Sequence, residues 1–233
     1  MPQKIVVLTG AGMSADSGLA TFRDSGGLWE GYDVYEVATP EGWNSDPEKV
    51  LEFYNKRRKQ AAQAEPNKGH LALARLEEKF DTTIITQNVD DLHERAGSSD
   101  VIHLHGQLSK VRSEKNENLI FDIGDKEIYI GDKADDGAQL RPHVVWFGEM
   151  VPKIEKAAEI IPESDIFIVI GTSLVVYPAA GLVDFAPENA EKYIVDPSTP
   201  EIQTGDDWQH YKERASEGVP KVVDKLLNEY KQS

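Results

Sequence analysis

The sequence predicts an α/β fold: a Rossmann-like parallel sheet with helices on both faces and a small inserted lobe. Short apolar, β-branched runs alternate with segments of helical periodicity, which is the pattern of consecutive β–α–β units. Two polar, turn-rich stretches interrupt this alternation. We therefore expect one domain, with a large lobe from about residues 1–25, 66–106 and 141–233 and a small lobe from about 26–65 and 107–140.

The elements follow from local periodicity and from turn residues. Strands are expected at Lys4–Thr9, Thr82–Thr86, Val101–Leu104, Val144–Phe147, Asp165–Ile170 and Lys192–Val195, with shorter pieces at Leu119–Ile123 and Glu127–Ile130. Helices are expected directly after the first strand, around Pro47–Gln63 and Asn67–Phe80, and at the end of the chain, where Val222, Val223, Leu226 and Leu227 recur at helical spacing.

Composition excludes several classes of protein. The 25 basic and 41 acidic residues give a formal charge of −16, which repels phosphate backbones and argues against a nucleic-acid partner. The same field favours cationic ligands such as lysine-rich protein segments. The chain contains no cysteine, so it has no disulfide, no thiolate nucleophile and no cysteine-ligated metal.

Hydropathy predicts a cytoplasmic protein without a membrane span. No apolar run reaches the roughly 18 residues that a spanning helix needs. The first apolar run, Ile5–Leu8, is too short for a signal peptide. We expect a monomer.

A glycine-rich turn follows the first predicted strand. Its sequence, Gly10-Ala11-Gly12-Met13-Ser14-Ala15, fits the G-x-G-x-x-G/A pattern, in which glycines let the backbone approach a phosphate closely. A plain tight β–α turn is the alternative. A hydride-transferring dehydrogenase is disfavoured, because the next clear strand begins only at Thr82.

Polar side chains also follow three other predicted strands, where parallel sheets bind ligands. They are Gln87, Asn88 and Asp90, then His103 and His105, then Gly171, Thr172 and Ser173. Asp90 alternatively caps the next helix. The two histidines share one face of a strand, but no third ligand follows at metal-binding spacing, so a general base at His105 is favoured over a metal site.

Six motifs, in order along residues 5–180, give the chain a specific resemblance. They are Gly10–Ser14 (GAGxS), Gly18–Arg23 (GLxxFR), Thr86–His93 (TQNxDxLH), His105-Gly106 (HG), Arg141–Glu149 (RPxVVxFGE) and Gly171–Leu174 (GTSL). Together they resemble the sirtuin family, the NAD-dependent protein-lysine deacylases, in its bacterial type. The family transfers the acyl group of a modified lysine to ADP-ribose and releases nicotinamide.

The resemblance implies a role for each matching residue. The cofactor NAD would contact Gly10, Ala11, Gly12, Ser14, Phe22, Arg23, Gln87, Asn88, Asp90, Gly171, Thr172 and Ser173. Asn88 and Asp90 would line the nicotinamide pocket and count with His105, the general base, as catalytic residues. Val145, Trp146, Phe147 and Gly148 would pair with an extended acylated-lysine peptide through their backbone.

The chain departs from the family in two places. Most sirtuins carry two cysteine pairs that bind a structural zinc between the positions of His105 and Arg141. This chain has none, so we expect no zinc and a module held by packing alone. The family often has an asparagine after the late strand to hold the adenine ribose; here Asp196 stands there and is expected to accept ribose hydroxyls, with Ala215 also near the cofactor.

Tyr54 and Arg57 are three positions apart on a predicted helix and therefore lie on one face. A solvated basic helix with Tyr54 in the core is the ordinary interpretation. Tyr-x-x-Arg at this place nevertheless resembles the sirtuins that remove succinyl and malonyl groups, because a guanidinium and a phenol can bind the distal carboxylate.

The sequence thus predicts NAD-dependent removal of acyl groups, succinyl or malonyl and acetyl, from protein lysines. Two alternatives remain open: a protein mono-ADP-ribosyltransferase that uses the same cleft, and a non-catalytic NAD-sensing module. The presence of His105 favours deacylation over the transferase, and turnover of nicotinamide with an acyl peptide would dismiss the sensing module.

Overall fold

A six-stranded parallel sheet forms the larger part of the computed structural model, which describes residues 2–20, 28–29, 31–198 and 207–230. Its strands are β1 (Lys4–Thr9), β4 (Asp81–Thr86), β5 (Val101–His103), β9 (Ile166–Ile170), β10 (Glu191–Val195) and β11 (Trp208–Tyr211). They lie in the order β11-β10-β9-β1-β4-β5, and every neighbouring pair is parallel. The predicted Rossmann-like sheet is confirmed.

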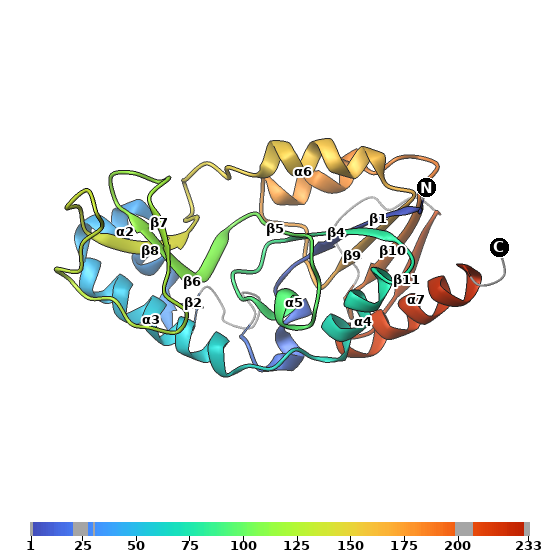
Figure 1. Ribbon diagram of the computed structural model, residues 1–233, viewed down its shortest axis with the longest axis horizontal. Coiled ribbons are helices and arrows are strands. Elements are labelled where there is room, and N and C mark those ends of the chain that lie inside the picture. Colours follow the sequence, from blue (N-terminus) through green and yellow to red (C-terminus); the bar gives the residue numbers. More distant parts are fainter. Residues whose placement is uncertain (1, 21–27, 30, 199–206, 231–233) are drawn as a thin grey trace.

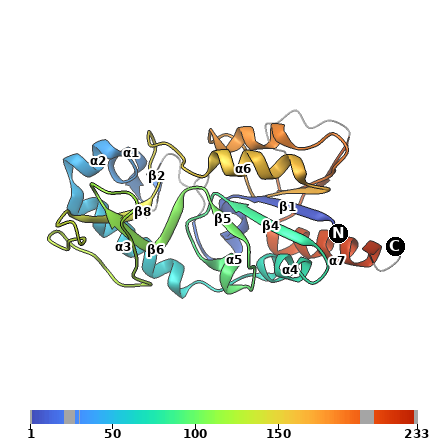
Figure 2. The same cartoon turned by 45° about the horizontal axis from the view of Figure 1, so that its top comes forward.

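Helices cover both faces of this sheet (Figures 1 and 2). Ile5 and Val7 pack with α4 (Lys68–Leu76) and α7 (Ala215–Tyr230) in one core cluster. Val6 and Leu8 face the other way, toward α6 (Ile154–Ile160) and the 3-10 segment Ala179–Phe185. The alternation along β1 thus buries both faces, as a doubly wound sheet requires. None of the helices in the described part of the chain has the length and apolarity to cross a membrane.

A second, smaller sheet lies beside the first, on the left in Figure 1. It contains β6 (Gly106–Ser113), β7 (Ile120–Asp122) and β8 (Leu140–Val144) in the antiparallel order β7-β6-β8. Helices α1 (Val34–Val37), α2 (Pro40–Ser45) and α3 (Pro47–Gln63) pack against it around a core cluster of their own. The remaining elements are the β2–β3 pair (Leu28–Trp29 and Tyr32–Asp33) and α5 (Leu92–Arg95).

Several predicted elements differ in the structure. The predicted strand Val144–Phe147 is wrong, because β8 ends at Val144 and the next three residues form a loop. The predicted strand piece Glu127–Ile130 is also wrong, because the backbone there bonds to a side chain and not to a strand. The expected helix after the glycine turn is replaced by two 3-10 turns, Ala11–Met13 and Ala15–Ser17. The short pair β2–β3 and the strands β6 and β11 were not predicted.

Two buried polar side chains of α3 hold the 107–140 segment. Asn55 donates to the carbonyl of Ile128 at 2.9 Å and accepts from its amide at 3.1 Å. The guanidinium of Arg58, only 2% exposed, donates to Asn55 Oδ1 (2.8 Å) and to the carbonyls of Leu108 (2.6 Å) and Lys126 (3.3 Å). The expectation that packing alone holds this module is therefore incomplete, because buried hydrogen bonds tie it to α3.

Replacing Arg58 with methionine should destabilise the fold. The substitution leaves buried carbonyls without donors, each of which costs about 1–3 kcal/mol. We expect a loss of about 2–4 kcal/mol in the free energy of unfolding, measured by urea denaturation. Arg75→Met is the matched control, because its ion pair with Asp224 is half exposed and contributes about 0–1 kcal/mol. Equal losses in the two variants would contradict this role of Arg58.

Chelation should leave the fold unchanged. Within the described ranges there is no group of three or more His, Cys, Asp or Glu side chains placed to hold a metal ion. We expect the same melting temperature with and without excess EDTA, and no zinc by elemental analysis, because thiolate ligands are absent. Stoichiometric zinc, or unfolding in the chelator, would overturn this expectation.

Candidate active site

A cavity of about 780 Å³ lies at the carboxyl ends of the parallel strands. It sits where the strand order changes direction, between β1 and β9, which is where doubly wound sheets bind ligands. The predicted site residues that line it are Gly10, Ala11, Gly12, Ser14, Tyr54, Arg57, Gln87, Asn88, Asp90, His105, Val145, Trp146, Phe147, Gly148, Gly171, Thr172, Ser173, Asp196 and Ala215. Phe22 and Arg23 lie outside the described residues.

Glycines bring two strand ends into direct contact on the floor of the cavity. The amide of Gly12 donates to the carbonyl of Gly171 at 2.8 Å, and the amide of Gly10 donates to Ile170 at 3.0 Å. A Cβ on Gly12 would lie 2.7 Å from the Cα of Gly171. The backbone of the facing turn thus occupies the space that a side chain would fill. Glycine turns of this kind at the ends of parallel strands are typical of diphosphate sites.

Ser14, Asn88 and Asp90 form a buried hydrogen-bond chain. The Asn88 amide donates to Ser14 Oγ at 3.1 Å, and the Ser14 hydroxyl bonds to the Asp90 carboxyl, which also accepts the amide of Leu92 at 3.2 Å. Burial raises the pKa of the Asp90 carboxyl, and the bonds from Leu92 and Ser14 oppose that rise. Asp90 therefore does both things considered for it, bonding the turn before α5 and lining the cavity.

His105 is oriented by a backbone carbonyl. Its Nδ1 lies 3.0 Å from the carbonyl oxygen of Gln87, which can only accept. In the neutral ring Nδ1 therefore carries the proton and Nε2 keeps its lone pair. Burial lowers the pKa of His105 below its ordinary value, so the ring is neutral at physiological pH. His105 is thus set up to accept a proton at Nε2.

His103 is buried and takes part in a different set of bonds. Its Nδ1 lies 3.1 Å from the carbonyl of Asn88 and its Nε2 lies 2.7 Å from Glu94 Oε1. Burial raises the pKa of the Glu94 carboxyl, but the hydrogen bond from His103 and its charge bring it below its ordinary value. The two ring nitrogens of His103 thus connect the Asn88 backbone to the Glu94 carboxylate.

Thr172 links the turn after β9 to the turn after β4. Its Oγ1 accepts from Gln87 Nε2 at 3.1 Å and from the amide of Leu174 at 3.2 Å. The carbonyl of the same Gln87 orients His105. Gln87 therefore connects the turn at Thr172 to the imidazole of His105.

Asp196 and Ala215, the two residues expected near the adenine ribose and the cofactor, both line the cavity. Asp196 lines the cavity, but its Oδ1 accepts from the amide (2.9 Å) and hydroxyl (2.8 Å) of Ser198 in a local turn. Ala215 is the first residue of α7 and lines the cavity. Sequence reasoning missed Asp16 and Arg214, which line the cavity and form an ion pair at 2.9 Å. No local pattern signals a contact between residues 198 positions apart.

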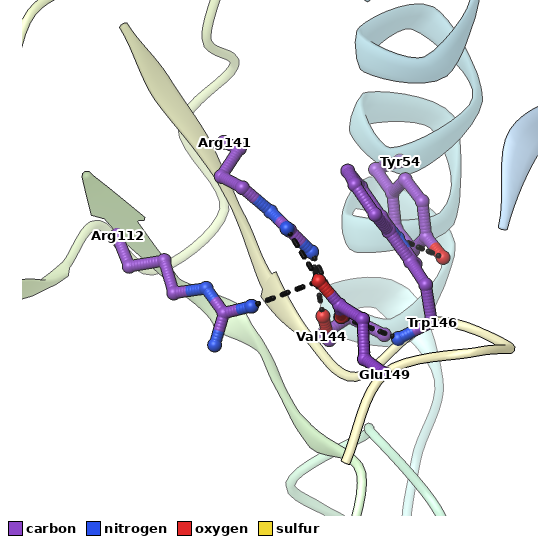
Figure 3. Close-up of polar contacts among 6 residues, drawn as sticks. All are labelled: Tyr54, Arg112, Arg141, Val144, Trp146 and Glu149. Atoms are coloured by element: carbon purple, nitrogen blue, oxygen red, sulfur yellow. Dashed lines mark hydrogen bonds and ion pairs between the residues drawn. The ribbon is translucent and has the colours of Figure 1, made fainter. Parts of the chain in front are cut away.

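Helix α3, which packs against the smaller sheet, also lines the cavity. Tyr54 and Arg57 of α3 are both buried there. Burial raises the pKa of the Tyr54 hydroxyl, and the positive charge of Arg57 opposes that rise. The helix face that carries them is therefore interior, and the interpretation as a solvated basic surface is wrong. Figure 3 shows Tyr54 beside Trp146 of the loop after β8.

The loop after β8 uses much of its own backbone. The amide of Val145 donates to the carbonyl of His105 and the amide of Phe147 to that of Ala38, both at 2.9 Å. The amide of Trp146 donates to Glu149 Oε2 at 2.8 Å. These bonds tie the loop to the backbone at His105 and Ala38, and the loop lines the cavity.

Comparison with known proteins identifies this arrangement. Residues 10–178 match the model of the Sir2 family. An NAD-dependent protein deacylase from Bacteroides thetaiotaomicron is 53% identical, covering 97% of this chain and 98% of the relative. One from Helicobacter pylori strain J99 is 50% identical, covering 97% and 96%.

Solved structures agree with that match. A Sir2 homologue in complex with NAD superimposes with a TM-score of 0.88 at 40% identity, covering 98% of this chain and 91% of the other. Sir2Tm bound to a propionylated peptide gives a TM-score of 0.77 at 29% identity, covering 100% and 95%. With its motifs gathered around one cavity, the chain belongs to the Sir2 family, the sirtuins.

Proposed function

We propose that this protein removes acyl groups from protein lysines with NAD as co-substrate, producing free lysine, nicotinamide and O-acyl-ADP-ribose. The observation that carries the proposal is the single cavity that joins the glycine contact, the Ser14–Asn88–Asp90 chain and His105. The names of the relatives and the NAD and acyl-peptide complexes of the solved homologues support it.

The cofactor fits the residues present. Because Gly10, Gly12 and Gly171 carry no side chains, the two turns pack together and line the cavity, where we propose that the diphosphate lies. The buried Asn88 and Asp90 offer polar groups to a nicotinamide. We propose that these residues hold NAD, together with Ala11, Ser14, Phe22, Arg23, Gln87, Thr172, Ser173, Asp196 and Ala215. Bound NAD supplies an electrophilic ribose carbon when its nicotinamide leaves.

The protein's own contribution to the chemistry is orientation and one proton acceptor. The Gln87 carbonyl holds the proton of His105 on Nδ1, so Nε2 is the atom that takes a proton from a ribose hydroxyl. Because burial lowers the pKa of His105, the basic form persists on the acidic side of the ordinary histidine value. The amides of Val145, Trp146 and Phe147 are already bonded, so we expect peptide pairing through the carbonyl oxygens of this loop and Gly148.

The acyl group proposed as preferred is an acidic one, succinyl or malonyl. Tyr54 and Arg57 are buried and line the cavity, so the guanidinium can pair with a distal carboxylate and the phenol can add a second donor. Burial raises the pKa of the Tyr54 hydroxyl far above neutrality, so it stays a neutral donor.

The products distinguish deacylation from the two alternatives. We would incubate the protein with NAD and one peptide carrying acetyl-, malonyl- or succinyl-lysine and analyse it by mass spectrometry. Free lysine together with acylated ADP-ribose supports the proposal. Peptide or protein carrying ADP-ribose would indicate a mono-ADP-ribosyltransferase, and NAD binding without nicotinamide release would indicate a sensing module.

The setting of the reaction is part of the proposal. We propose a two-lobed monomer acting in the cytoplasm, with lobes from about 1–25, 66–106 and 141–233 and from about 26–65 and 107–140. The net charge of −16 supports cationic, lysine-bearing protein segments as partners and disfavours nucleic acid.

Replacing His105 with alanine should remove most of the acyl transfer. A positioned general base contributes about 100- to 10,000-fold, so kcat should fall by that factor while the affinity for NAD, measured by calorimetry, changes little. His143→Ala is the control, because this nearby imidazole does not line the cavity. Near-native deacylation by the His105 variant would disprove the assignment of the base.

Replacing Arg57 with methionine should reduce desuccinylation selectively. Loss of a buried partner for a carboxylate costs on the order of 2–5 kcal/mol. The acetyl group has no carboxylate, so its turnover does not depend on that partner. The ratio of kcat/KM for succinyl- over acetyl-lysine should therefore collapse, and Tyr54→Phe should move it less in the same direction. Lys56→Met, an exposed neighbour on α3, is the control. Equal losses on both substrates, or no desuccinylation by the parent protein, would leave a plain deacetylase.

A further inference from the structure

The hydroxyl of Tyr54 has one hydrogen-bond partner within the described residues, the indole of Trp146. Trp146 Nε1 lies 3.1 Å from Tyr54 Oη. A dashed line marks this hydrogen bond in Figure 3. An indole N–H can only donate, so the phenol oxygen is the acceptor in this bond. The hydroxyl proton of Tyr54 is therefore left to be donated elsewhere, and the side chain, 1% exposed, lines the cavity.

Trp146 is itself held on several sides. Its backbone amide donates to Glu149 Oε2 at 2.8 Å, and its ring lies under the guanidinium of Arg141, with Cζ 3.3 Å from the ring centroid. Arg141 in turn pairs with Glu149 at 2.7 Å and donates to the carbonyl of Val144 at 3.1 Å. The ring of Trp43 packs against that of Trp146, with a centroid distance of 5.8 Å. The indole N–H is thus fixed in direction before any substrate arrives.

We propose that Trp146 is a specificity-determining positioning residue, which occupies the acceptor side of the Tyr54 hydroxyl and so presents that hydroxyl to the acyl group only as a donor. The inference rests on the proposed function, because it concerns the same acyl end of the cavity. A distal carboxylate accepts the proton that Tyr54 must donate. An acetyl methyl group cannot, and it leaves a buried donor without a partner. Because a hydrogen bond accepted by the phenol also polarises its O–H, Trp146 strengthens the donation.

Trp146→Phe tests the inference, because it removes the indole N–H and keeps an aromatic ring for Arg141 and Tyr54. We would measure kcat and KM for succinyl- and acetyl-lysine on one peptide. One hydrogen bond contributes about two- to tenfold in affinity, so the succinyl-to-acetyl ratio of kcat/KM should fall by about that factor, mainly through KM for the succinyl peptide. Trp43→Phe, a matched substitution in the same aromatic cluster that does not bond Tyr54, should leave the ratio unchanged.

A double-mutant cycle separates positioning from packing. In a Tyr54→Phe background, Trp146→Phe should no longer change the ratio, because its effect acts through the Tyr54 hydroxyl. A reduction of equal size in both backgrounds, or equal losses on both substrates, would overturn the inference.

A readout without turnover keeps the two proposals distinguishable. With tyrosine labelled at ¹³Cζ, the resonance that disappears in Tyr54→Phe should shift in Trp146→Phe and stay in place in Trp43→Phe. If the parent protein desuccinylates but Trp146→Phe changes neither this resonance nor the ratio, only the role of Trp146 fails. If the parent protein does not desuccinylate, the proposed acyl preference fails and the specificity role fails with it, even where the resonance shift confirms the bond.

Discussion

The contact between two glycine turns is the constraint on which the site depends. Gly171 has a φ of +59°, and a Cβ there would lie 2.5 Å from the backbone nitrogen of Met13. Only glycine meets both conditions, because other residues are strained at positive φ and would overlap the facing chain. This contact lets the turns after β1 and β9 pack together, and its glycines line the cavity.

Hydrogen bonds connect the remaining polar groups of the site to the two glycine turns. Thr172, one residue after Gly171, bonds Gln87, and Gln87 orients His105. On the other side Ser14, two residues after Gly12, connects Asn88 to Asp90. A shift of either turn would therefore move both the proton acceptor and the residues proposed for nicotinamide. Helix α3 adds Tyr54 and Arg57 to the lining of the same cavity, and burial keeps the Tyr54 hydroxyl neutral.

The sequence predicted those parts of the molecule that local signals determine. The buried run Lys4–Thr9 and the helix Pro47–Gln63, which begins with proline after the capping Asp46, were predicted with the observed bounds. Strand β6 was missed because its sequence mixes polar and apolar residues and its burial depends on partners far along the chain. Glu127–Ile130 has a strand-like composition, yet the side chain of Asn55 takes its backbone bonds.

The site could be predicted where motifs carry it, and not where long-range contacts do. Residues that follow the strands, such as Asn88 and His105, gather as expected because parallel strand ends share one edge. The pairing of Asp16 with Arg214 and of Tyr54 with Trp146 joins segments that no local period relates. These contacts depend on tertiary packing.

The most direct test of this account is the affinity of Gly171→Ala for NAD, measured by calorimetry beside Gly181→Ala. A methyl group at Gly181 meets only ordinary contacts, at 3.6 Å from Tyr177, so that variant should bind as the parent does. Strain at positive φ and the overlap with Met13 should weaken binding by Gly171→Ala at least about tenfold. A folded Gly171→Ala protein that binds NAD with the parent affinity would contradict the central place of the glycine contact.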